Sequence, residues 1–90
     1  FGQYPMVAGQ VPKIVQLCEE VIKIDPSEVF AERFKGQCLY MVGDYQGAIR
    51  SLNRTIELDE TPESYYYRAM AKRKASDQTY LDDFRRMMEL

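Results

Sequence analysis

The chain has 90 residues and a formal net charge of -2 at pH 7, and 46% of its residues are hydrophobic and 29% charged. This composition predicts one small folded domain and excludes an intrinsically disordered chain. The near-neutral charge argues against a general attraction to nucleic acid or anionic membranes, and no apolar run approaches the roughly 18 residues that span a bilayer. Because the chain does not begin with Met and its first residues lack the charged start of a signal peptide, we expect a piece of a longer protein.

The first half of the chain predicts two helices from apolar residues at helical spacing. The first is expected over residues 11–24, with Pro12 in its first turn and Pro26 just beyond its end. The second is expected over residues 29–42, followed by Gly43, which favours the left-handed conformation that ends many helices.

Three further helices follow, each with its own start signal. Asp44 is a candidate cap for a helix over residues 45–58. The segment Thr61–Glu63 offers a cap, a first-turn proline and an acidic residue for a helix over residues 62–75. The last apolar stripe runs over residues 80–90. Since the alternation typical of a strand is missing, the sequence predicts an all-α fold of antiparallel hairpins.

An internal repeat connects these helices. Residues 9–26 lie over residues 43–60 at an offset of 34 residues, so that Gly9 matches Gly43 and Asp25 matches Asp59. A repeat of this length is typical of stacked helical arrays, whose units bury their apolar faces only against neighbouring units.

The middle unit, residues 29–62, resembles the tetratricopeptide repeat family. Gly36 and Ala48 occupy the positions at which that family has small residues. Gly43-Asp44-Tyr45 matches the turn between its two helices, and Ile56–Asp59 resembles the motif that ends its repeat unit. The resemblance implies a right-handed α-α superhelix, a helical-repeat solenoid of about two and a half helix-turn-helix units.

The units differ in how well they match. We expect one domain over residues 1–90, made of a partial unit over 1–28, a complete unit over 29–61 and a divergent unit over 62–90. Residues 1–8 would be only the tail of a first helix. In the complete unit, Glu32 and Lys35 occupy positions at which the family prefers large apolar groups, so we expect altered packing there.

The resemblance also implies a function without catalysis. Members of the family hold a peptide segment or a partner subunit in a concave groove lined by the first helix of each unit. Mixed aromatic, thioether and cationic groups suit such a groove. By this resemblance the partner-binding residues are Phe30, Arg33, Gln37, Tyr40, Met41, Tyr66, Met70, Arg73 and Lys74.

Alternatives remain for parts of this set. Phe30 and Tyr66 would lie outside the groove if they packed internally. The basic stretch over residues 68–74 is either a solvated helix surface or a patch for an acidic peptide, and the acidic residues around it disfavour RNA. The apolar end of the last helix, with Met87 and Met88, suggests a second hypothesis, in which the chain self-associates into a homo-oligomer. With respect to a bound ligand, we expect both methionines to pack the last helix rather than to contact it.

Residues suited to catalysis or to cofactor binding are scarce. The chain has no histidine, no phosphate-binding loop and no nucleophile elbow, so we expect no enzyme activity, cofactor or metal. The adjacent carboxylates, such as Asp82-Asp83, are interpreted as solvated groups or as partners of helix dipoles. Cys18 and Cys38 are interpreted as buried hydrophobes of a reducing, cytoplasmic compartment, with a disulfide between them as the alternative.

Overall fold

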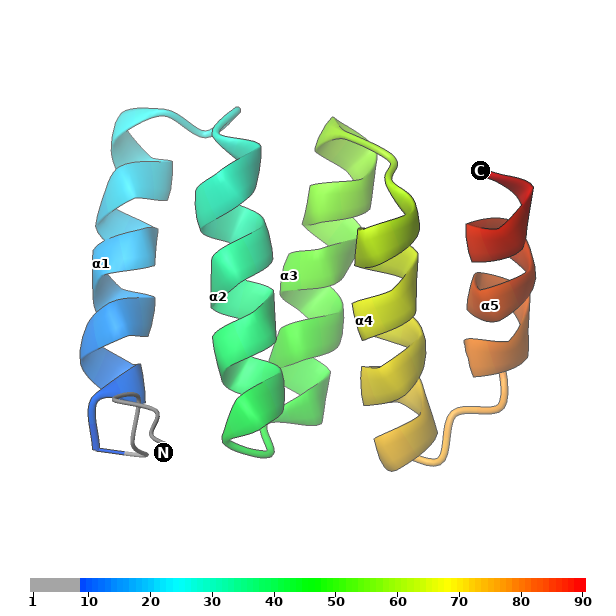
Figure 1. The fold of residues 1–90 in the computed structure, drawn as a ribbon. Helices are drawn as coiled ribbons and strands as arrows, with labels where there is room; N and C mark the ends of the chain where they lie inside the picture. Colours follow the sequence, from blue (N-terminus) through cyan, green and yellow to red (C-terminus); the bar gives the residue numbers. More distant parts are fainter. Residues whose placement is uncertain (1–8) are drawn as a thin grey trace, which may run out of the picture.

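The computed structural model describes residues 9–90, and it shows a row of helices that run alternately up and down in chain order (Figure 1). The prediction of an all-α fold is therefore confirmed, and three helices end one residue earlier than expected. The expectation for residues 1–8 lies outside the described residues. The helices are α1 Val11–Ile24, α2 Val29–Met41, α3 Tyr45–Leu58, α4 Pro62–Lys74 and α5 Tyr80–Glu89.

The predicted caps position the starts of α3 and α4. The carboxylate of Asp44 accepts a hydrogen bond from the backbone N–H of Gly47 at 2.9 Å, at the start of α3. The Thr61 hydroxyl accepts one from the N–H of Ser64 at 3.3 Å, and Pro62 is the first residue of α4. Each cap satisfies a backbone donor that a helix start leaves without an intrahelical partner.

The turn after α2 and the turn after α4 have the same backbone geometry. Gly43 has φ 88° and Ser76 has φ 63°, so both residues adopt the left-handed conformation. In each turn the following aspartate, Asp44 or Asp77, donates its backbone N–H to the carbonyl five residues earlier, at 2.9 and 2.8 Å. The internal repeat therefore extends to the divergent unit, where a serine takes the conformation that usually favours glycine.

Helix packing follows the order of the chain. Each helix packs against the next one, and α2 also packs against α4, whereas α1, α3 and α5 make no direct contact with one another. Consequently α2 and α4 adjoin on one side of the array, and the other three helices are separated by them (Figure 1). This arrangement is that of a helical repeat; the right-handed superhelix stays a prediction.

Small residues allow α2 and α3 to approach closely. A Cβ atom added to Gly36 would lie only 2.9 Å from Cγ of Leu52, and both Leu52 and Ala48 are completely buried. The prediction that Gly36 and Ala48 lie where two helices meet is confirmed. Closer helix axes let the apolar side chains of both helices interdigitate.

Some residues that fit the predicted apolar stripes are exposed to solvent in the structure. Phe30 and Met41 fit the apolar spacing of α2, and they are 61% and 58% exposed because α2 packs through its small residues, such as Ala31 and Gly36. Met88 was expected to pack within α5 and is 82% exposed, since no described helix covers that side of α5.

The two cysteines are buried, as predicted, and both thiols are free. Burial raises the pKa of the Cys18 thiol and the pKa of the Cys38 thiol, which disfavours the reactive thiolate. The alternative of a disulfide between them is therefore wrong for this structure.

Candidate functional site

The residues predicted to bind a partner all lie at the surface of α2 and α4, and none of them is buried. Arg33 of α2 reaches Glu63 of α4, with 3.9 Å between Nη1 and Oε1, so the two helices adjoin at this level. Phe30, Met41 and Tyr66 are the exposed large hydrophobic residues of the set. The alternative that Phe30 and Tyr66 are buried inside the array is wrong.

The aromatic residues of this set nevertheless extend toward different neighbours. Phe30 stacks on Phe34 of the same helix, with ring centroids 5.8 Å apart and an interplanar angle of 13°. Tyr66 lies 6.4 Å from the ring of Phe84, which belongs to α5. The candidate surface therefore spreads from the α1 side of α2 to the α5 side of α4, wider than a narrow stripe between the two helices.

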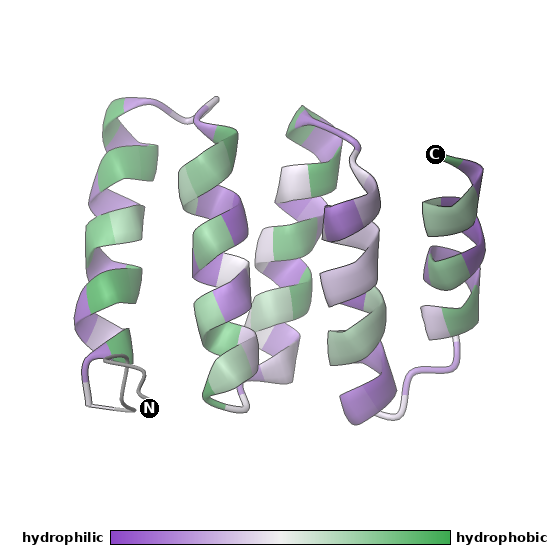
Figure 2. Ribbon diagram, in the orientation of Figure 1, coloured by the Kyte–Doolittle hydropathy of each residue, from purple (hydrophilic) through white to green (hydrophobic). Residues whose placement is uncertain are grey.

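The basic stretch of α4 divides into two parts. Arg73 and Lys74 are exposed and have no ion pair within residues 9–90. Arg68 and Lys72 turn instead toward α5, where they meet Asp83. The C-terminal part of α4 is strongly hydrophilic (Figure 2). Only the first of these pairs remains available to an acidic partner.

A buried ion cluster lies between α3, α4 and α5, and the solvated interpretation of Asp83 is wrong. Asp83 is 3% exposed, and its carboxylate accepts hydrogen bonds from Nε and Nη2 of Arg68 at 2.9 and 2.6 Å. Nζ of Lys72 lies 3.2 Å away, and Arg68 also donates to the side-chain oxygen of Asn53 at 2.9 Å. The hydrogen bonds to Asp83 raise the pKa of Arg68 above its ordinary value, so this cluster fixes α5 through charge.

A second charged contact ties the segment between α3 and α4 to α5. Arg86 donates from Nε and Nη2 to the carboxylate of Glu60, at 3.0 and 2.9 Å. The hydrogen bonds from Arg86, and next the one from the hydroxyl of Tyr65, lower the pKa of Glu60. The sequence analysis missed this contact because its partners are 26 residues apart in the chain.

An apolar cleft opens between α1 and α2, and the sequence analysis did not predict it. Its volume is about 430 Å³. Leu17 and Val21 of α1 belong to it and are 60% and 42% exposed, although Val21 is part of the apolar stripe of α1. The signal that indicates such a cleft is the incomplete first unit, which leaves α1 with α2 as its one neighbour among the described helices. The cleft is lined by Ile14, Leu17, Cys18, Val21, Glu28, Phe30, Ala31 and Phe34.

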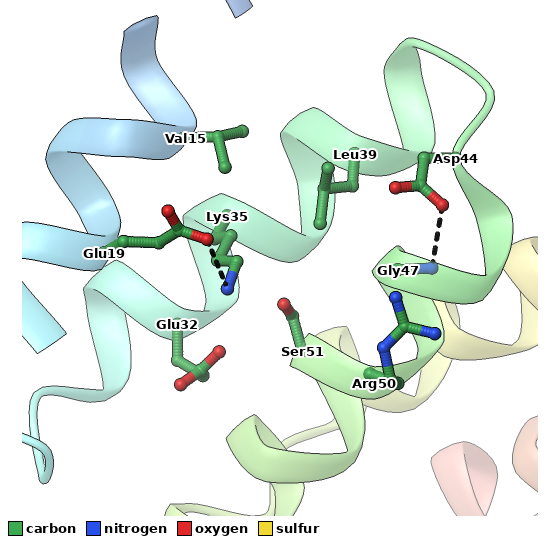
Figure 3. A pocket seen from close by; sticks show the side chains of 9 residues that line it. All are labelled: Val15, Glu19, Glu32, Lys35, Leu39, Asp44, Gly47, Arg50 and Ser51. Atoms are coloured by element: carbon green, nitrogen blue, oxygen red, sulfur yellow. Dashed lines mark hydrogen bonds and ion pairs between the residues drawn. The ribbon is translucent and has the colours of Figure 1, made fainter. Parts of the chain in front are cut away.

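A polar pocket of about 270 Å³ lies between α1, α2 and α3 (Figure 3). It forms at Glu32 and Lys35, where the resemblance led us to expect altered packing. Lys35 pairs with Glu19 of α1, with 3.2 Å between Nζ and Oε2, while Glu32 is 8% exposed. The lining residues are Val15, Glu19, Glu32, Lys35, Leu39, Asp44, Gly47, Arg50 and Ser51.

Other site types find little support among residues 9–90. That part of the chain contains no group of three or more histidine, cysteine, aspartate or glutamate side chains placed to hold a metal ion. It also contains no helix with the length and apolar character that a membrane crossing requires. Comparison with models of known protein families gives no match, and no curated protein matches the chain.

Proposed function

We propose that the chain is a tetratricopeptide-like, non-catalytic module that holds a peptide segment or a partner subunit on the side formed by α2 and α4. The observation that carries the proposal is the exposure of large hydrophobic groups on two helices that adjoin. Phe30, Met41 and Tyr66 are all more than 40% exposed on this pair. Several large exposed apolar groups on adjoining helices of a small folded domain support an interaction surface there.

The charge of this surface indicates the kind of partner. Arg73 and Lys74 project from the last turn of α4 with no ion pair in the described part of the chain, and Arg33 has only a long contact with the exposed Glu63. Aromatic and thioether groups bind the apolar side chains of a peptide, while cationic groups at the rim favour carboxylates. We therefore infer an acidic, partly apolar peptide segment as the partner, met in a reducing, cytoplasmic compartment.

A selected peptide tests this proposal. A displayed library of peptides is screened against the protein, and the affinity of an acidic binder is measured by fluorescence anisotropy. The double variant Arg73→Glu, Lys74→Glu should weaken the affinity about tenfold, because two rim attractions become repulsions. The matched control, Lys13→Glu with Lys23→Glu, makes the same charge change on α1 and should leave the affinity within about twofold. Equal loss in both double variants would refute the assignment to the α2 and α4 surface.

The exposed apolar side chains along α5 and just beyond it favour self-association as a second function. Leu81, Met88 and Leu90 are 47%, 82% and 49% exposed on or beside this helix. A second copy of the chain that covered them would remove apolar area from water. Light scattering at micromolar concentration should then show a mass that rises with concentration, and Met88→Glu should abolish the rise. A constant monomer mass contradicts this function.

A further inference from the structure

Two groups of three consecutive helices each enclose a buried carboxylate, and only one of these carboxylates has direct ion-pair partners. Between α3, α4 and α5 the buried carboxylate of Asp83 is neutralised by Arg68 and Lys72 of α4. Between α1, α2 and α3 the polar pocket is lined by another buried carboxylate, that of Glu32 on α2, which is 8% exposed. Glu32 makes no side-chain hydrogen bond or ion pair within residues 9–90. The carboxylate of Glu32 is therefore buried without a direct partner in the described part of the chain, and Lys35 of the same pocket pairs with Glu19 instead.

The polar residues near Glu32 form ion pairs or hydrogen bonds with other groups. Lys35 turns to Glu19 of α1, and the carboxylate of Asp44 accepts the N–H of Gly47 (Figure 3). Arg50 is exposed, and its guanidinium lies at the Gly47 end of the pocket rather than beside Glu32 (Figure 3). Its charge is therefore screened by solvent.

Glu32 stands near the start of α2, in its first turn, where the positive end of the helix dipole stabilises an anion. A buried anion without a counter-ion is strongly destabilising, and a charge-assisted hydrogen bond to a cation removes this penalty. The pocket beside it has room for such a group, about 270 Å³ between three helices.

We propose that this pocket binds the guanidinium group of an arginine side chain that a partner protein inserts, with Glu32 as its counter-ion. The volume is below the range of about 300–1,000 Å³ typical of sites for drug-sized ligands, which favours a single side chain. A guanidinium offers five donors, enough to engage both oxygens of Glu32 and still reach the hydroxyl of Ser51 at the pocket wall. A metal ion fits less well because it requires several free carboxylates and finds one.

This pocket is separate from the surface of the proposed function. Glu32, Lys35 and Leu39 follow one side of α2 at spacings of three and four residues. Arg33 and Gln37 lie on the opposite side of α2, given the 3.6-residue helical turn. A partner could therefore occupy the pocket while a peptide lies on α2 and α4, and either proposal can fail without the other.

A capped arginine tests the proposal without knowledge of the partner. N-acetyl-arginine-amide is titrated into the isotope-labelled protein, and the amide signals of residues 32–36 and 47–51 are followed by NMR. We expect saturable shifts with a dissociation constant of about 1 mM to 10 mM, as for a single side-chain contact. N-acetyl-citrulline-amide, the neutral isostere, should bind at least about tenfold more weakly. Absence of saturable shifts up to about 50 mM arginine probe would overturn the proposal.

Variants assign the binding to Glu32. Glu32→Gln should lower the affinity for the arginine probe at least about tenfold. Glu20→Gln, on an exposed part of α1, should leave that affinity unchanged. Arg50→Gln should strengthen binding about twofold, because it removes a like charge near the entrance. Equal affinities of the wild-type protein and Glu32→Gln, or shifts that map to residues 66–74 instead, would overturn the assignment.

Thermal unfolding gives an independent readout. Without ligand, Glu32→Gln should raise the melting temperature, since it removes an unpaired buried charge and keeps the shape of the side chain. A lower melting temperature would show that Glu32 already has a partner inside the chain, and the proposal would fail.

Discussion

Replacement of Gly36 by alanine tests how tightly α2 and α3 are packed. The added Cβ would lie 2.9 Å from Cγ and 3.1 Å from Cδ2 of Leu52, and 3.4 Å from Cβ of Ser51. Leu52 is completely buried, so its side chain cannot move into solvent. Overpacking of this kind costs about 1–3 kcal/mol, while alanine gains up to about 1 kcal/mol over glycine within a helix. The free energy of unfolding of Gly36→Ala should therefore fall, by up to about 2 kcal/mol.

The assay is urea unfolding followed by circular dichroism, in the wild-type background and in Leu52→Ala. Leu52→Ala itself costs about 2–5 kcal/mol, so both backgrounds are measured in the same concentration of sucrose. With the leucine side chain removed, alanine at position 36 has room, and Gly36→Ala should stabilise by up to about 1 kcal/mol. The reversal of sign is the decisive result. An equal loss in both backgrounds would show that the distance to Leu52 does not control this site.

Three further changes follow from the turns and charged contacts. Ser76→Gly should raise the free energy of unfolding by about 0.5–1 kcal/mol in urea unfolding, because Ser76 has φ 63°. Asp83→Asn should lower it by about 3 kcal/mol by the same assay, because it leaves Arg68 without its buried counter-ion. Since the pKa of Glu60 is lower when folded, its contribution is present above the ordinary value of 4.5 and is lost as the pH falls through the lowered pKa. Arg86→Gln should flatten this acid-side loss of the melting temperature, and an unchanged pH profile would contradict the assigned cause.

The helix boundaries were predictable because local chemistry determines them. Pro62 and the cap of Thr61 start α4, and Gly43 and Asp44 separate α2 from α3, each within a few residues of chain. Such signals act through the backbone and do not depend on which helices become neighbours. The small residue at Gly36 was equally informative, since glycine inside a helix indicates close approach.

Side-chain environments were less predictable, because they depend on which side of a helix meets its neighbour. Phe30 fits an apolar stripe, yet α2 packs through smaller residues and leaves it 61% exposed. Asp82 and Asp83 look alike in sequence, but only Asp83 faces α4, and its partner Arg68 lies 15 residues away. The polar pocket was signalled by Glu32 and Lys35; its open volume depends on how three separate helices are spaced.

The order of helix contacts has a consequence for how binding and folding are coupled. Among the described helices α1 contacts α2 alone, so it can detach while α2, α3 and α4 stay packed. The polar pocket takes part of its wall from Val15 and Glu19 of α1, so it exists only while that helix is docked. A group bound in the pocket therefore shifts the docking equilibrium of α1 toward the attached state, by an amount that grows with the ratio of its free concentration to its dissociation constant. The affinity of the pocket for its ligand and the stability of α1 docking therefore depend on each other.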